Sequence, residues 1–404
     1  MPNFENARSI ILQNISPLGS EKVPLLEALG RVLSEDIIAP WDLPLCDNSA
    51  MDGFAVLAAD CATIPKDLKI TGYIPAGGVI SHHVEPGCAI TIMTGAPVPP
   101  GCTAVVPVEE TEQANETVTI KAKVNNRQHI RFRGEDIAIG STVVTAGTVI
   151  RPAEINMLAS LGKTYIPVYR KARIAILSTG DELIEPGETP SPGQIINSNA
   201  LSLAAAVRES GAEPVMLGIA QDNMESHRKK MIEGLECDAM ITSAGVSAGD
   251  RDFVREVLAE LGVNQIFWKV DIKPGGPTAF GMKDHRPVFS LPGNPVSTMV
   301  TFELFVKPAL LRLMGHKKTI RTFIKGILQE DASKKAGKAN FIRVRIEKKD
   351  GRYLASSAGE QQTGILRTMV TADGLAMLPL EATLVPAGSE VDLLLMSNVD
   401  MVAE

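Results

Sequence analysis

The sequence predicts a fold of class α/β plus β, in which a doubly wound α/β domain is joined by two β-rich domains. Strands and helices alternate between residues 171 and 318, as they do when a mostly parallel sheet is wrapped by helices. Residues 41–139 are instead rich in Val, Ile, Thr, Gly and Pro, and from residue 319 onward the pattern again favours strands. A chain of 404 residues is also too long for one core, since single domains rarely exceed about 300 residues.

Two short helices flank the first β-rich region. Apolar residues at helical spacing predict a helix over 4–15, and a second helical pattern at 152–161 opens with a proline and is followed by a glycine. We expect these two helices to pair. The segments 1–40 and 140–170 would then form one linking domain, with the β-rich domain 41–139 inserted into it.

The inserted domain contains the stretch "DNSAMDGFAV" at residues 47–56. Its polar residues and its glycine are typical of a turn that leads into a strand beginning near Phe54. Asp47 and Asn48 already supply the side chains that such a turn needs. The turn therefore leaves Asp52 without a structural reason.

Apolar runs alternate with amphipathic segments in the α/β domain, 171–318. The predicted strands are 173–178, 214–220, 237–243, 265–272 and 286–291. The predicted helices are 199–211, 224–236, 252–262 and 295–315. In the C-terminal β domain, 319–404, the sequence "KKDG" predicts a hairpin turn between the strands "NFIRVRI" and "RYLASSA".

The composition narrows the partners and the compartment that we expect. A net charge of −7 argues against nucleic-acid binding, which depends on clustered Lys and Arg. The five cysteines include no C-x-x-C pair, which argues against a zinc knuckle and favours the reduced thiols of a cytoplasmic protein. Neither a secretory signal nor a run of 18 apolar residues is present, so we expect no membrane association.

Four polar loops follow predicted strands of the α/β domain, and parallel strands bring such loops to one edge of the sheet. The loops are "STGDEL" (178–183), "AQDN" (220–223), "SAGVSAGDRD" (243–252) and "SLPGNP" (290–295). Their glycines let backbone N–H groups approach an oxyanion, and the helix that begins near Asp252 presents its positive end. The substrate-binding candidates in these loops are Gly180, Ser243, Gly245, Gly249, Asp250, Gly293 and Asn294.

Carboxylates gather in the same loops. Glu182, Asp222, Asp250 and Asp252 would repel one another at one sheet edge unless a cation compensates them. Either Asp250 or Asp252 is also expected to cap the following helix. Carboxylate oxygens together with phosphate chemistry favour Mg²⁺, and we expect Glu182 and Asp222 to be its ligands.

Positive charge for an anionic substrate is available from Lys269 and Lys273 in "WKVDIKPGGP". Two common nucleotide motifs are missing. The "GKT" at 162–164 resembles the end of a P-loop, but Met157 stands where the first glycine is required, and no G-x-G-x-x-G follows a strand. Neither a P-loop kinase nor a Rossmann NAD enzyme is therefore expected.

Several of these stretches together resemble the MoeA family of molybdopterin molybdenumtransferases, which includes the gephyrin E domains. The stretches are "DNSAMDGFAV", "IMTGAPVP", "RGEDI", "STGDEL", "SAGVSAGDRDF", "IKPGGPTAFG" and "SLPGNPVS", and they follow the family's order over nearly the whole chain. The resemblance implies transfer of molybdenum from molybdate to the dithiolene of adenylylated molybdopterin, with release of AMP and with assistance from Mg²⁺. It also implies an elongated four-domain chain with a molybdopterin-binding type of α/β domain, and a homodimer. A molybdopterin adenylyltransferase and molybdoenzyme apoproteins are the protein partners to consider.

The resemblance assigns residues to the family's cleft and places Asp52 in an active-site loop. The matching positions are Asp52, Thr94, Asp136, Glu182, Asp222, Asp252, Lys269, Lys273, Pro292 and Pro295. We interpret the carboxylates among them as catalytic, and the threonine, lysines and prolines as substrate-binding.

One departure from the family concerns molybdate. Many members read Lys-Pro-Gly-Lys-Pro where this chain reads "KPGGP", so Gly276 stands where a second lysine would contact the anion. Lys273, with a candidate Arg343 from the C-terminal domain, is then the main positive charge, which leaves the affinity for molybdate open.

Two other functions compete with the transferase. A molybdopterin adenylyltransferase shares the α/β domain and a similar glycine-rich loop, but usually lacks the flanking β domains and the "DNSAMDG" segment. A gephyrin-like scaffold would bind partner proteins without catalysis, and the intact set of acidic residues argues against it.

Overall fold

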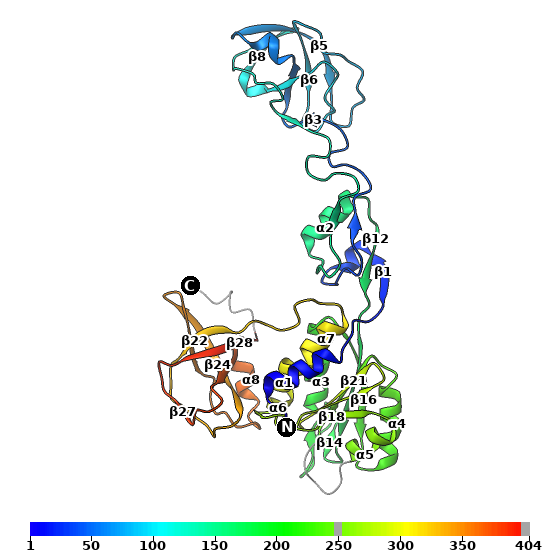
Figure 1. The fold of residues 1–404 in the computed structure, drawn as a ribbon, viewed down its shortest axis with the longest axis vertical. Coiled ribbons are helices and arrows are strands. Elements are labelled where there is room, and N and C mark those ends of the chain that lie inside the picture. The colour runs from blue at the N-terminus through cyan, green and yellow to red at the C-terminus, as the bar shows by residue number, and fades with distance from the viewer. Residues whose placement is uncertain (246–252, 397–404) are drawn as a thin grey trace. The chain divides into compact units, whose positions relative to one another are not determined.

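The structure, a computed structural model, describes residues 1–245 and 253–396 (Figure 1). Its chain divides into two compact units. The first unit comprises Met1–Ser34, Gly147–Arg151 and Tyr165–Glu404, and the second comprises Glu35–Ala146 and Pro152–Thr164. The predicted linking domain is divided between the two units, and the division of the chain into four domains stays a prediction.

A six-stranded sheet forms the centre of the first unit. Its strands are β13 (Arg173–Thr179), β16 (Glu213–Ala220), β17 (Ala239–Ser243), β18 (Asn264–Phe267), β20 (Ala279–Lys283) and β21 (Arg286–Leu291). They lie in the order β16-β13-β17-β21-β20-β18, in which the first four strands are parallel and β20 is antiparallel to both of its neighbours, β21 and β18. The mostly parallel sheet that the sequence predicts is confirmed.

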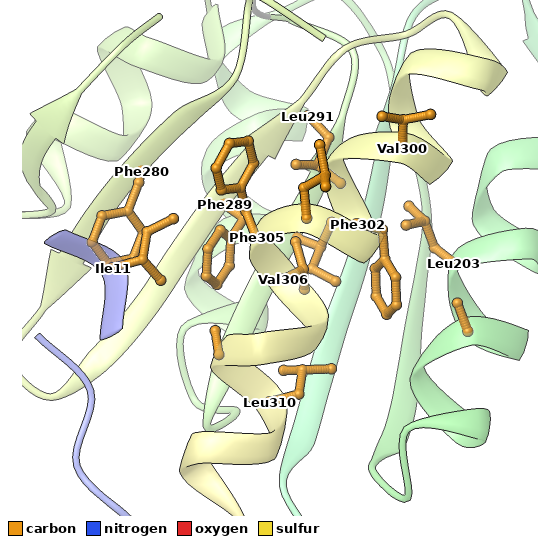
Figure 2. Close-up of a cluster of buried hydrophobic side chains, with 14 of the residues drawn as sticks. Ile11, Leu203, Phe280, Phe289, Leu291, Val300, Phe302, Phe305, Val306 and Leu310 are labelled. Atoms are coloured by element: carbon orange, nitrogen blue, oxygen red, sulfur yellow. The ribbon is translucent and has the colours of Figure 1, made fainter. Parts of the chain in front are cut away.

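Alternate residues of β13 face opposite sides of this sheet. Ile174 and Ile176 belong to one buried cluster, while Ala175 and Leu177 belong to another. The strand is apolar on both faces because helices cover both, as is usual for parallel sheets. The covering helices are α3 (Ser198–Glu209), α4 (Met224–Gly234), α5 (Phe253–Glu260) and α6 (Pro295–Thr301). Figure 2 shows part of the first cluster, in which side chains of α3, α6 and the helical segment after α6 pack with side chains of β20 and β21.

The helix predicted at 295–315 is one helical run that changes its period. After α6 comes a π-helical turn, Phe302–Val306, and then α7 (Lys307–Leu313). Pro308 has no N–H to donate to the preceding turn, which removes one α-helical hydrogen bond at this place. In the described ranges, no helix combines the length and the apolar character that crossing a bilayer requires.

The N-terminal helix α1 (Phe4–Gln13) packs against α7. The ring of Phe4 lies 5.8 Å from that of Phe305 and 5.0 Å from that of Phe341. The helix after the insertion, α2 (Pro152–Ser160), belongs to the second unit, so its pairing with α1 stays a prediction. Aromatic side chains of the first unit pack on the apolar face of α1.

The second unit contains another six-stranded sheet. Its strands are β4 (Gly53–Val56), β5 (Lys66–Ile74), β6 (Cys88–Ile92), β7 (Ala104–Pro107), β8 (Thr111–Ala114) and β9 (Thr117–Ile120). They lie in the order β7-β4-β6-β5-β9-β8, and β4 is the strand predicted near Phe54. A Cβ on Gly53 would lie 1.9 Å from the carbonyl oxygen of Val106, so the close approach of β7 requires glycine there.

Smaller elements complete both units. The paired strands are β1 (Ser20–Pro24) with β12 (Tyr165–Tyr169), β2 (Ile37–Ile38) with β11 (Thr142–Val144), and β3 (Asn48–Ser49) with β10 (Ile130–Arg131). Short 3₁₀ helices cover Leu25–Ala28, Ala58–Cys61 and Val108–Glu110.

The C-terminal region of the first unit is a barrel. Its strands are β22 (Ile324–Leu328), β24 (Ala339–Lys349), β25 (Arg352–Ser357), β26 (Gly374–Leu378) and β28 (Glu390–Leu395). Each pairs with two of the others, so the strands close into a ring. The predicted hairpin at "KKDG" is confirmed, because Asp350 and Gly351 have the positive φ values, 50° and 75°, that a two-residue turn of this kind needs. The pair β23 (Ala332–Ser333) with β27 (Leu384–Val385) and the helix α8 (Arg367–Thr371) complete this region.

The single strand predicted at 265–272 is wrong. Strand β18 ends at Phe267, and the chain bends before a separate strand, β19 (Ile272–Lys273), pairs in parallel with β24 of the barrel. The bend is closed by a hydrogen bond of 2.9 Å from the N–H of Ile272 to the carbonyl of Val270. Lys273 therefore belongs to the barrel sheet rather than to the α/β sheet.

Candidate active site

A pocket of about 420 Å³ lies at the carboxyl edge of the parallel strands. The loops after β13, β17 and β21 line it, since parallel neighbours end side by side. The predicted site residues in its lining are Glu182, Ser243, Gly245, Pro292, Gly293, Asn294 and Pro295. The structure thus brings together residues that are more than a hundred positions apart in the sequence.

Glu182 stands in the turn between β13 and the short strand β14 (Leu183–Ile184). The preceding Gly180 has a φ of 138°, and a Cβ there would lie 2.4 Å from Oε2 of Glu182. This φ favours glycine, and any side chain at position 180 would displace the carboxylate of Glu182. The N–H of Gly180, which was expected to approach an oxyanion, donates to the carbonyl of Ala220 over 3.1 Å.

Asp222 is exposed on the loop after β16 and is not part of the pocket lining. Its N–H donates to Oδ1 of Asp181 over 3.0 Å, which ties this loop to the loop of Glu182. Asp181 was missed by the sequence reasoning, although it precedes Glu182 in "STGDEL". Its signal was weak because a loop aspartate beside glycine is typical of a turn.

The acidic residues of the described ranges provide few ligands for a cation. Within the described ranges, no three His, Cys, Asp or Glu side chains are grouped so that they could hold a metal. Mg²⁺ often takes only one or two carboxylates and completes its shell with water and substrate phosphate. The exposed carboxylates of Glu182 and Asp222 fit that smaller requirement. The predicted residues Gly249, Asp250 and Asp252 lie outside the described residues.

Two asparagines in the same pocket were missed by the sequence reasoning. Oδ1 of Asn197 accepts a hydrogen bond from the hydroxyl of Ser178 over 2.8 Å. Nδ2 of Asn199 donates to Oγ of Ser243 over 3.0 Å and to the carbonyl of Gly293 over 2.8 Å. Their only signal was a pair of polar side chains at the start of a helix, a place where capping is the usual explanation.

A second pocket, of about 250 Å³, is found where β19 pairs with the barrel. Lys273, Asn340 and Arg343 are among its lining residues, and Lys273 is exposed. Lys269 is also exposed but lines neither pocket. Of the two lysines that the sequence put forward together, Lys273 lines this pocket and Lys269 does not.

Arg343 is 1% exposed, and most N–H groups of its guanidinium donate hydrogen bonds to other protein atoms. Its Nε donates to Oγ1 of Thr368, Nη1 to the carbonyl of Gln361, and Nη2 to the carbonyls of Glu360 and Gln362, over 3.0–3.1 Å. Burial lowers the pKa of Arg343 from its usual value. The side chain that was expected to bind substrate thus fixes the loop after β25.

In the second unit, the N–H and the hydroxyl of Thr94 both donate to Oδ1 of Asp52, over 2.6 and 2.8 Å. These hydrogen bonds, from the backbone first and the hydroxyl second, hold the pKa of Asp52 below its usual value. Asp136 lines a separate pocket of about 520 Å³ in the same unit, together with Asn48 and Arg131. The structure brings Asp52 to Thr94, and it places Asp136 in different surroundings.

Family models match three successive parts of the chain. Residues 3–162 match the MoeA N-terminal region (domain I and II), 175–312 a probable molybdopterin binding domain, and 325–396 the MoeA C-terminal region (domain IV). A molybdopterin molybdenumtransferase 2 of Mycobacterium tuberculosis is 38% identical over 381 residues, which cover 91% of this chain and 93% of the relative. The chain belongs to the MoeA family.

Other MoeA relatives agree in sequence and in fold. A molybdopterin molybdenumtransferase of Haemophilus influenzae is 35% identical over 397 residues, 97% of this chain and 98% of the relative. The crystal structure of a molybdopterin biosynthesis MoeA protein from Pyrococcus horikoshii matches with a TM-score of 0.85 at 30% identity. That match covers 98% of this chain and 99% of the other. The family that the motifs indicated, and its multidomain fold, are confirmed.

Proposed function

We propose that the chain is a molybdopterin molybdenumtransferase, which moves molybdenum from molybdate to adenylylated molybdopterin and releases AMP in molybdenum cofactor biosynthesis. The observation that carries this proposal is the pocket at the sheet edge, lined by the loops whose motifs resemble those of the family. The names of relatives at 35–38% identity support the same activity. The MoeA matches on both sides of the α/β domain favour a transferase over an adenylyltransferase.

The pocket at the edge of the parallel sheet, which we call the larger pocket of the first unit, receives the adenylylated pterin. Its 420 Å³ and its mixture of apolar and polar side chains suit a flat, polar ring system. Glu182 and Asp222 would hold Mg²⁺, which when bound neutralises the charge that develops on the departing phosphate. Both carboxylates are exposed, so the ion that they bind can also take water and phosphate oxygens as ligands.

The smaller pocket receives molybdate. Of the cationic side chains in its lining, Lys273 is exposed and Arg343 is buried with its donors engaged. Lys273 therefore supplies the charge that attracts the anion, while Arg343 positions the loop beside it.

Three further expectations belong to this proposal and come from the family resemblance. The chain forms a homodimer, it works in the cytoplasm, and it exchanges its substrate and product with a molybdopterin adenylyltransferase and with molybdoenzyme apoproteins. Sedimentation equilibrium tests the first of them, since a monomer at micromolar concentration would contradict it.

The decisive experiment incubates the purified chain with adenylylated molybdopterin, Mg²⁺ and molybdate. We expect AMP and a molybdenum-bearing pterin to appear together, each dependent on both ions. AMP release without molybdenum incorporation, at the same rate with and without molybdate, would replace the transferase by a hydrolase. Omission of Mg²⁺ alone tests the assignment of the ion.

A further inference from the structure

Asn197 and Asn199 line the pocket at the sheet edge, and in each side-chain amide one of the two polar atoms makes hydrogen bonds while the other has no partner among the described residues. Asn197 is 2% exposed, and in the described part of the chain its Nδ2 has no hydrogen-bond partner. The Oδ1 of Asn199 is likewise buried and without a partner among the described residues. A buried amide atom without a partner is unfavourable and rare in folded proteins, so these two atoms ask for an explanation.

The orientation of Asn199 is fixed by its partners. Its Nδ2 donates both hydrogens, one to Oγ of Ser243 and one to the carbonyl oxygen of Gly293. A carbonyl oxygen can only accept, so the amide cannot be rotated to exchange its nitrogen and oxygen. The free atom of Asn199 is therefore a hydrogen-bond acceptor.

Asn197 precedes the first turn of α3, where an asparagine commonly caps the helix. Its side chain makes no capping hydrogen bond here. Instead Oδ1 accepts from the hydroxyl of Ser178, on the neighbouring strand β13, and Nδ2 is left as a donor. The side chain therefore does not cap the helix, and it lines the pocket.

The two free atoms are a donor and an acceptor, both uncharged. The phosphates that link an adenylylated pterin are fully ionised at neutral pH and offer only acceptor oxygens, so the oxygen of Asn199 would repel them. A lactam, with an N–H beside a C=O, offers the complementary pair. The exposed side chain of Ile195 lines the same pocket and offers apolar contact to a flat ring.

We propose that Asn197 and Asn199 bind the lactam edge of the pterin ring. Nδ2 of Asn197 donates to the C4 carbonyl, and Oδ1 of Asn199 accepts from N3–H. The inference rests on the proposed function, because it names the part of that substrate which the pocket distinguishes. The hydrogen bonds with Ser178, Ser243 and Gly293 hold both amides in place before the ring binds.

The test measures binding of small pterins rather than molybdenum transfer. 6-Hydroxymethylpterin, its N3-methyl derivative and AMP are titrated separately into the full chain by calorimetry. We expect the N3-methyl derivative to bind wild-type protein about tenfold more weakly than the parent pterin, because it lacks the N–H that Asn199 accepts. Equal affinity for the two pterins, or no binding of the parent pterin, would overturn the proposal.

The variants separate the two asparagines. Asn199→Ala should abolish the difference between the two pterins, and a difference that persists in this variant would exclude Asn199 as its source. Asn197→Ala removes the donor without adding a charge, so it should weaken binding of the parent pterin about tenfold. AMP should bind both variants as it binds the wild type, and loss of AMP binding alone would assign the asparagines to the nucleotide.

A matched control is available at another helix start. Asn3 caps α1 with its side-chain oxygen, which accepts from the N–H of Asn6, and an aspartate there keeps this bond. Asn3→Asp should therefore leave pterin binding unchanged. Because these titrations contain no molybdate and no adenylylated pterin, they can fail while the transferase assay succeeds, and the reverse also holds.

Discussion

Arg170 and Asp238 form a two-bond ion pair, with Nη1 to Oδ2 at 2.7 Å and Nη2 to Oδ1 at 2.5 Å. Oδ2 of Asp238 also accepts from the N–H of Arg173 over 2.8 Å, at the start of β13. The carboxylate thus fixes the point where the chain enters the parallel sheet. Burial alone would raise the pKa of Asp238, but the bonds from Arg170 and Arg173 outweigh it and lower the pKa.

Replacing Asp238 by Ala should reduce the free energy of unfolding by about 2 kcal/mol, because it leaves Arg170 and a backbone N–H without their partner. The pKa of Asp238 is lowered in the folded state, so its stabilisation is present above the unfolded-state value of about 4 and is lost as pH falls below it. Urea unfolding at pH 7 and pH 3 measures both effects. The exposed pair of Lys121 and Glu112 is the control, and Lys121→Ala should change stability little. A difference between wild type and Asp238→Ala that is as large at pH 3 as at pH 7 would contradict the assignment.

Thr94→Val should raise the pKa of Asp52 part of the way to its usual value. The substitution removes the hydroxyl bond but keeps the backbone N–H, which is the larger cause of the lowered pKa. Carboxyl ¹³C chemical shifts followed between pH 2 and pH 7 report this pKa directly. Thr94→Ser, which keeps the hydroxyl, should titrate like the wild type. An unchanged titration in Thr94→Val would mean that the hydroxyl bond does not form in solution.

Much of this arrangement could be predicted from the sequence, and the misses have physical reasons. Apolar runs ending in glycine-rich loops gave the parallel sheet and its site edge, because period and turn chemistry are local properties. The division of 265–272 into two strands was missed, since pairing of β19 with the barrel depends on partners about seventy residues away. Burial of Arg343 was missed for the same reason, because the carbonyls that receive its N–H groups lie on another loop.

Glu182→Gln should lower Mg²⁺-dependent AMP release at least about a hundredfold while leaving the melting temperature unchanged. An exposed loop carboxylate contributes little to the core, so the loss would come from the ion that it binds. Glu188→Gln is the matched control, because Glu188 is exposed in the segment that follows and only its Oε1 bonds to the N–H of Glu185. A fall in melting temperature equal to that of a core variant would make Glu182 structural instead.

Lys273→Ala should raise the molybdate concentration needed for half-maximal activity more than it weakens binding of the adenylylated pterin. Lys273 lines the smaller pocket as an exposed cation. Removal of one charge-assisted hydrogen bond weakens the binding of an oxyanion by about tenfold or more. Steady-state assays at varied molybdate, with calorimetry for the pterin, separate the two effects. Lys335→Ala, an exposed lysine elsewhere in the barrel region, should change neither. If binding of molybdate and binding of the adenylylated pterin weakened equally, Lys273 would instead contact the phosphate of the pterin substrate.

Gly276→Lys should lower the molybdate concentration needed for half-maximal activity several-fold. A Cβ at this position would meet the carbonyl oxygens of Ile272 and Val270 at 3.4 and 3.6 Å, which is ordinary contact, and φ is not in the left-handed region. The backbone thus accepts the lysine that the family resemblance implies at this position, and the added charge attracts the anion. Gly276→Gln adds a long side chain without a charge, so it should leave the molybdate concentration for half-maximal activity unchanged. A lysine variant that behaves like the glutamine variant would show that position 276 does not face molybdate.

The pairing of β19 with β24, together with the contact of Phe4 with Phe341, has a consequence for recombination between related genes. A crossover near residue 319 would exchange the barrel while retaining the helix and the short strand that pack on it. Such a chimera would keep every loop of the parallel sheet, yet it would present Phe4 and Ile272 to a foreign partner. Barrel and parallel sheet are therefore expected to be inherited together, and exchange of the barrel should succeed only when α1 and β19 are exchanged with it.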